Sequence, residues 1–418
     1  MGKLMKKSGW PGFDKTDVLY LAAMTVIGMA IRLILRVVTT DDWGMYWDPW
    51  ISDLKEMGFS YLATDRYDYT PTFVYILWVI SKLPINPMTA YKGLHIVLDF
   101  VAAIVMGKIV WRVTGSSVKS ITAYGLMLLV PTIWANSALW AQCDIIFMTF
   151  LLLCFYYFFQ DRPNLAMFFY GMAFVFKLQS LFIFPFLVIL WVNKKVQLKH
   201  FLWIPALYFL SIIPAWIAGR PLMDLINIYM AQGAQDVWSL SIKWANIYQI
   251  IGNQYFLLEY AEAGTWLILG ILMILMFAMA QKRYKITNEF IVQMALFYAI
   301  LTPYILPHMH ERYGCVADIL AIIYAMMNVK KFYIPLAQLL VSFNCYMAYL
   351  SHRGASEPPI YYGVWAFLEL GLLILVGLDI WNYMRNPENQ ITEKQIKDAA
   401  ASGEGSTEHS AAVRKEGA

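Results

Sequence analysis

Five short polar segments interrupt an otherwise apolar chain and carry most of its candidate chemistry. They are residues 41–42, 140–144, 177–179, 244–246 and 307–313. Ionisable side chains beside membrane-spanning segments are energetically costly, so they are functional candidates by default. If the five segments lie at one face of a membrane, they can form a single site.

Asp42 follows the first apolar segment directly and is the preferred general base. A carboxylate at that depth can accept a proton from a hydroxyl group. A helix cap beside the membrane interface is the simpler alternative. The neighbouring Asp41 is the alternative base.

The segment 307–313 holds two histidines, a glutamate, an arginine and a tyrosine between two apolar stretches. Arginine binds phosphate bidentately, and imidazole or lysine can add positive charge. We therefore expect an anionic phosphate to contact the cations of this segment and of the segment 177–179, namely His308, His310, Arg312 and Lys177. A metal site is the alternative, but arginine has no role in a metal shell. A plain ion pair between Glu311 and Arg312 is the simplest structural interpretation.

Two further charged residues have simple alternatives of their own. Asp144 starts the fourth apolar segment and could serve only as a partner of the helix dipole. Lys177 lies near the outer end of the fifth, where an isolated lysine usually extends to the interface. If the fold brings Asp144 and Lys177 together, a functional role becomes the better interpretation of both.

Composition places the chain among membrane proteins. Of its 418 residues 60% are hydrophobic and 14% charged, with a mean hydropathy of +0.54. The 16 Trp, 27 Tyr and 25 Phe suit interfacial belts and an aromatic-lined cavity. A scattered net charge of +4 argues against nucleic acid as a partner. The four cysteines show no metal spacing, so we expect buried thiols.

Twelve apolar segments are candidate membrane spans, since a crossing helix needs about 20 residues. They lie near 17–38, 89–111, 119–138, 145–160, 164–178, 180–192, 200–218, 264–281, 287–304, 314–328, 332–350 and 361–384. The segment 69–84 has a shorter apolar run with Pro71 near its start, which suits an interfacial helix.

The basic loops set the orientation. If 69–84 does not cross and the N-terminus is cytoplasmic, lysines and arginines fall in nearly every cytoplasmic loop, following the positive-inside rule. All five polar segments then lie at the outer face. The basic start of the chain leads into a full-length span, so we expect no cleavable signal peptide.

The same topology divides the chain into three parts. We expect a cytoplasmic N-terminus (1–16), a membrane domain (17–385) and a disordered cytoplasmic tail (386–418) rich in small and charged residues. Two outer loops are long, about 39–88 and 219–263, and loops of this length are usually functional. The chain shows no internal repeat, which argues against inverted-repeat transporters.

Four motifs in order along the chain resemble those of GT-C glycosyltransferases, especially bacterial relatives of the GPI mannosyltransferase family. The matching segments are 68–77, 140–146, 177–181 and 308–313, the last as His-Met-His-Glu-Arg-Tyr. Ala141 stands where the family has Gly, and Leu178 where it has Pro. These departures concern backbone geometry more than chemistry.

The resemblance implies an all-α GT-C fold of about twelve transmembrane helices, with juxtamembrane helices in the first and fourth outer loops. It implies a hexosyltransferase that uses a polyprenyl-phosphate-linked sugar donor and a glycan or glycolipid acceptor. The family's acidic base in the first outer loop corresponds to Asp42. Sugar and acceptor would then contact Asp144, Gln142, Glu311, Tyr313, Trp244, Asn246, Tyr248, Gln179 and Tyr69.

We expect the protein in a bacterial inner membrane with its active site extracytoplasmic. No cofactor is required by this scheme, and a divalent metal is not indicated although some GT-C enzymes use one. Two other functions stay open: a polysaccharide polymerase or ligase, and a transporter of lipid-linked glycans. Donor, acceptor and linkage are not written in the sequence.

Overall fold

Helices dominate the computed structural model, which describes residues 12–233, 239–252, 261–281, 284–352 and 359–391. Six helical stretches are long and apolar enough to cross a membrane. They are α1 (Lys15–Leu35), α4 (Pro87–Thr114), η6 with α10 (Leu198–Leu202, Trp203–Ala218), α14 (Ala261–Ala280), η8 with α17 (Val329–Lys331, Tyr333–His352) and α18 (Pro359–Arg385). The chain thus has the build of an all-α membrane protein.

A seventh span is possible across a bend. Helix α5 (Ser117–Leu129) is followed by α6 (Pro131–Trp134) and the π-helical turn η4 (Ala135–Trp140). The two parts pass the same length and hydropathy test together, with a bend of 46°. Pro131 starts the second part, as expected where a proline cannot continue a helix.

The remaining five predicted spans also form helices, but shorter ones. They are α7 (Asp144–Phe158), α8 (Pro163–Phe176), η5 with α9 (Leu178–Ile183, Phe184–Val192), α15 (Asn288–Ile305) and α16 (Cys315–Met327). None exceeds 18 residues, whereas a straight crossing needs about 20. Each of the twelve predicted segments is therefore helical, and the number that cross stays a prediction.

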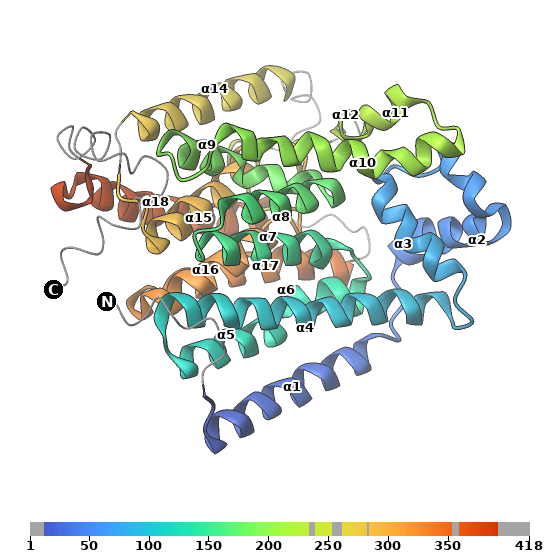
Figure 1. The fold of residues 1–418 in the computed structure, drawn as a ribbon, viewed down its shortest axis with the longest axis horizontal. Coiled ribbons are helices and arrows are strands. Elements are labelled where there is room, and N and C mark those ends of the chain that lie inside the picture. Colours follow the sequence, from blue (N-terminus) through green and yellow to red (C-terminus); the bar gives the residue numbers. More distant parts are fainter. Residues whose placement is uncertain (1–11, 234–238, 253–260, 282–283, 353–358, 392–418) are drawn as a thin grey trace.

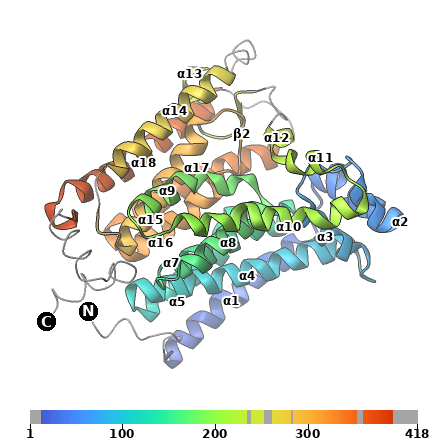
Figure 2. The same ribbon diagram turned by 45° about the horizontal axis from the view of Figure 1, so that its top comes forward.

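The helices run side by side along the long axis of the molecule (Figure 1). The start of α1 and the end of α18 lie at one end, drawn at the left. Four short helices of the two long predicted outer loops lie at the opposite end in both views (Figure 2). They are α2 (Asp48–Met57), α3 (Pro71–Ser81), α11 (Leu222–Ile226) and α12 (Ile228–Gly233).

Aromatic packing holds the first of these loops together. The π-helical turn η2 (Trp43–Trp47) precedes α2, and the 3-10 turn η3 (Gly58–Ala63) follows it. The Trp47 ring centroid lies 5.1 Å from that of Phe73 and 5.3 Å from that of Trp50. Helix α3 has 11 residues, too few to cross a bilayer as a helix, which agrees with the predicted juxtamembrane segment.

A two-residue parallel sheet joins the other long loop to the segment after α15. Strand β1 (Ser241–Ile242) pairs with β2 (Met309–His310), with Ser241 opposite Met309 and Ile242 opposite His310. The backbone N–H of His308 donates to the carbonyl of Leu240 at 2.9 Å. The short helix α13 (Tyr248–Ile251) follows β1. The predicted fourth and fifth outer loops are thus bound to each other.

One buried ion pair ties α1 to the rest of the bundle. Arg32 Nε donates to Asp99 Oδ2 at 2.6 Å, and both side chains are fully buried. The Arg32 Nη1 group donates to the carbonyls of Gly28 and Leu128, and the Ser137 hydroxyl donates to the same Asp99 oxygen. Most other residues of α1 are exposed in the structure, so this pair is a principal contact of that helix.

Candidate active site

Asp42 accepts hydrogen bonds from three neutral donors. The Trp140 Nε1–H and the Gln142 amide donate to Oδ2 at 2.8 and 2.5 Å, and the Tyr349 hydroxyl donates to Oδ1 at 2.9 Å. The side chain makes no capping hydrogen bond to the turn that follows it. Asp42 is 8% exposed, whereas Asp41 is exposed. The three donors therefore fix the orientation of the Asp42 carboxylate, and a capping role has no support; its role as a base stays a prediction.

Backbone contacts place Asp42 beside Trp140. The Lys92 ammonium donates to the carbonyls of Val38 and Leu139 at 2.5 and 3.0 Å, and the Thr40 hydroxyl donates to the carbonyl of Trp140 at 2.9 Å. These bonds join the segment after α1 to the end of η4. The backbone that carries Asp42 and the backbone that carries Trp140 are therefore bound to each other.

The backbone turn after η4 supports the same arrangement. Ala141 adopts a left-handed conformation with φ of 66°, which glycine adopts without strain and other residues rarely adopt. It is the position at which the motif resemblance noted from the sequence would place a glycine. The turn directs Trp140 and Gln142, on either side of it, to one carboxylate oxygen of Asp42.

Asp144 is the centre of a second group of polar side chains. The Lys177 ammonium forms an ion pair with Oδ1, and the Asn136 amide donates to Oδ2 at 2.7 Å. Arg312 Nε lies 3.7 Å from Oδ2. Asp144 and Lys177 are 2% and 6% exposed. Lys177 is therefore buried and paired, and Asp144 does more than complement a helix dipole.

Arg312 and Glu311 form the ion pair that the sequence left open as a structural alternative. Arg312 Nη1 donates to Glu311 Oε1 at 2.7 Å, and His310 Nδ1 lies 3.8 Å from Oε2. Burial by itself raises the pKa of Glu311, but the nearby His310 and the positive charge of Arg312 outweigh it and hold the pKa below its usual value. Arg312 and Lys177 are thus balanced by two carboxylates, those of Asp144 and Glu311.

Trp140 connects the Asp42 group to the Arg312 group. The guanidinium carbon of Arg312 lies 5.4 Å from the Trp140 ring centroid, within the range of a cation–π contact. The Tyr349 ring stacks on the same indole, with centroids 4.5 Å apart. One indole therefore contacts both the candidate base, through Nε1, and the candidate phosphate ligand, through its ring.

Other predicted residues surround the cations. The Lys177 ammonium lies 5.9 Å from the Tyr69 ring centroid, and the Arg312 guanidinium lies 5.7 Å from that of Tyr313. The Gln179 side chain lies near the phenol of Tyr313. Four of the five polar segments thus meet at one place, together with Tyr69 from the first outer loop.

The fifth segment lies nearby but contributes differently. Trp244 is fully buried against Gly314, where an added Cβ would lie 2.2 Å from the indole. Asn246 is also fully buried and has no hydrogen-bond partner for its side chain. Tyr248 packs into the main apolar core, and His308 Nδ1 pairs with the carbonyl of Ser239 at 2.6 Å. No described contact joins these four residues to Asp42, Asp144 or Arg312.

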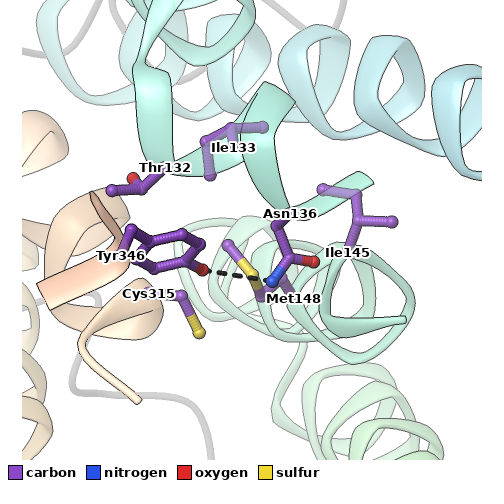
Figure 3. Close-up of a pocket in the computed structure, with 7 residues that line it drawn as sticks. All are labelled: Thr132, Ile133, Asn136, Ile145, Met148, Cys315 and Tyr346. Atoms are coloured by element: carbon purple, nitrogen blue, oxygen red, sulfur yellow. Dashed lines mark hydrogen bonds between the residues drawn. The ribbon is translucent and has the colours of Figure 1, made fainter. Parts of the chain in front are cut away.

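A narrow void lies beside Asn136, the amide donor to Asp144 (Figure 3). It is lined by Thr132, Ile133, Asn136, Ile145, Met148, Cys315 and Tyr346. The Asn136 amide and the Tyr346 hydroxyl point toward each other and are 3.1 Å apart. The void is too small for a water molecule. It is therefore not the aromatic-lined cavity predicted from the sequence.

Three residues of this arrangement were not predicted from the sequence. Asn136 lies within a predicted span, and Tyr346 and Tyr349 lie three residues apart on α17. Residues three apart share a helix face, so two tyrosines at the predicted outer end of a span were a usable signal. Among the described residues, no group of three or more His, Cys, Asp or Glu is placed to hold a metal ion.

No protein-family model matches the chain, and no curated protein matches it.

Proposed function

We propose that the protein is a GT-C-type glycosyltransferase that moves a sugar from a polyprenyl-phosphate-linked donor to a glycan or glycolipid acceptor. One observation carries the proposal: a carboxylate held by three neutral donors contacts the same indole as the half-buried Arg312. This combination supplies a proton acceptor and a phosphate ligand within one site. The resembling motifs contribute the class of donor.

The reaction would be a single inverting displacement. Asp42 accepts the proton of the acceptor hydroxyl while that oxygen attacks the anomeric carbon. The bond from this carbon to the donor phosphate oxygen breaks, and the lipid phosphate leaves with the electron pair. Arg312, with His310 and Lys177 beside it, stabilises the negative charge that develops. Asp144 keeps Arg312 and Lys177 in place.

Transfer assays test this proposal directly. Purified protein would be incubated with a panel of polyprenyl-phosphate sugars and candidate acceptors, with and without a chelator to reveal any metal requirement. We expect a single sugar to be added to the acceptor. Long products would indicate a polymerase, and movement of the lipid-linked glycan across vesicles without transfer would indicate a transporter.

The proposal also includes about twelve crossings, with the site at the extracytoplasmic face of a bacterial inner membrane. Cysteine labelling tests the orientation, because all four native cysteines are buried. Ser60→Cys, exposed in the first outer loop, should react with a membrane-impermeant maleimide from outside. Ser116→Cys, between α4 and α5, should be protected. The reverse pattern would place the site at the cytoplasmic face and contradict the proposal.

A further inference from the structure

Lys243 differs from Arg312 and Lys177 in having no acidic partner among the described residues. Its ammonium lies 5.1 Å from the centroid of the Tyr349 ring, and its side chain is half-buried. Lys92, the other cation near the Asp42 segment, is almost completely buried and bound to two carbonyl oxygens. Lys243 is therefore a positive charge beside the site that a substrate can neutralise.

The contacts around the site form an ordered series. Arg312 lies on the Trp140 ring, Trp140 stacks on Tyr349, and Tyr349 contacts Lys243. The polar edges of the two rings bind the two oxygens of Asp42, one each. Arg312 and Lys243 are thus adjacent to different rings, with Asp42 bound by both.

The backbone of Lys243 is fixed in an unusual conformation. Its φ is 62°, which a non-glycine residue keeps only where the surrounding structure holds it. Strand β1 ends at the preceding residue, and Lys243 itself forms a bridge with His310. The backbone bridge that fixes His310 therefore also fixes Lys243, whose side chain lies beside Tyr349.

An inverting displacement separates the roles of the two cations. The attacking hydroxyl and its base lie on the opposite face of the sugar from the leaving group. If Arg312 contacts the leaving phosphate, a cation beside Tyr349 is placed to meet the incoming acceptor. We propose, on the basis of the function proposed above, that Lys243 binds a carboxylate or phosphate group carried by the acceptor.

Kinetics with matched acceptors test this inference. Lys243→Met should raise the KM for an anionic acceptor by about tenfold or more, the effect of losing one charge-assisted contact. The kcat and the donor KM should change little, and Lys243→Arg should restore most of the affinity. Lys55→Met, an exposed lysine on α2, is the control and should behave like the parent protein. An unchanged acceptor KM, equal use of a neutral acceptor, or a raised donor KM would overturn the assignment.

A second experiment does not depend on transferase activity. Lysines of the folded protein would be acetylated with a membrane-impermeant reagent and quantified by peptide mass spectrometry. Methyl glucuronide or inorganic phosphate should protect Lys243 but not Lys55, and neutral methyl glucoside should protect neither. Protection without any transfer activity would refute the proposed function and leave the anion site standing. Equal labelling under all conditions would refute the anion site.

Discussion

The Arg32–Asp99 pair and the site around Asp42 are both buried polar groups, but their carboxylates have different partners. Asp99 is bound by a cation and a hydroxyl. Asp42 is bound by an indole, an amide and a phenol, and no described cation lies within ion-pair distance of it. The first arrangement neutralises a charge and joins helices. The second orients a carboxylate without pairing it to a cation, which is the arrangement that the proposed proton transfer needs.

Removing the charge of Asp42 should give the largest effect. Asp42→Asn keeps the size of the side chain but cannot accept a proton, so turnover should fall by about 10²–10⁴-fold. Thermal stability and donor binding should be nearly unchanged. Steady-state assays with the best donor from the panel measure this.

Asp41→Asn is the matched control and should retain most activity, because that side chain is exposed. If Asp42→Asn turns over normally and Asp144→Asn does not, the base is Asp144. If both turn over normally, the transferase proposal is wrong.

Breaking the buried Arg32–Asp99 pair should lower the stability of the fold and leave the catalytic step unchanged. Arg32→Met leaves Asp99 without its cation and should lower the free energy of unfolding by about 3–5 kcal/mol. Denaturation in detergent measures it, and the kcat of the folded fraction should persist. The double variant Arg32→Met/Asp99→Leu should recover much of the stability, since an apolar pair needs no charge partner. A double variant as unstable as the single one would contradict this view.

Replacing the planar guanidinium of Arg312 with an ammonium should give the next largest effect. Arg312→Lys retains a positive charge but loses the bidentate fork, so transition-state stabilisation should fall by about 2–4 kcal/mol. The ratio kcat/KM for the donor reports the loss. A fully active variant with unchanged donor affinity would leave Arg312 only its structural ion pair with Glu311.

The smallest effect should come from the indole N–H. Trp140→Phe keeps an aromatic ring for stacking on Tyr349 but removes one donor to Asp42. Losing a single hydrogen bond to a charged group corresponds to about 1.5–3 kcal/mol, or at least about tenfold in turnover. Since Gln142 and Tyr349 still bind Asp42, the loss should lie at the lower end. A loss as large as that of Asp42→Asn would instead indicate that Trp140 contacts the substrate directly.

The sequence predicted helical segments well because long apolar stretches and basic loops follow simple physical rules. It also predicted that Asp42, Asp144, Lys177 and Arg312 would share a face. It could not predict their pairing, because the pairing depends on the bend after α5 and on the left-handed turn at Ala141. Those features follow from packing between segments far apart in the chain.

One pair of residues was overlooked, and another was predicted without its depth in the structure. Arg32 and Asp99 lie inside predicted spans, where the rule that intramembrane charges are significant applied directly. Trp244 and Asn246 were predicted to line a sugar pocket, yet both are fully buried in the structure. A polar or aromatic residue in an outer loop reveals its type but not its depth. Residues 392–418, most of the predicted tail, lie outside the described residues.

The pairing of β1 with β2 has a consequence for how a substrate would be received. The backbone of His310 pairs with Ile242 and Lys243. Movement of the segment 239–252 would therefore also move His310 as long as this pairing is kept. Only a few backbone bonds resist such movement. Binding of an acceptor at Lys243 and positioning of His310 would then be coupled. An acceptor that binds without ordering Lys243 would leave His310 poorly positioned for the leaving phosphate.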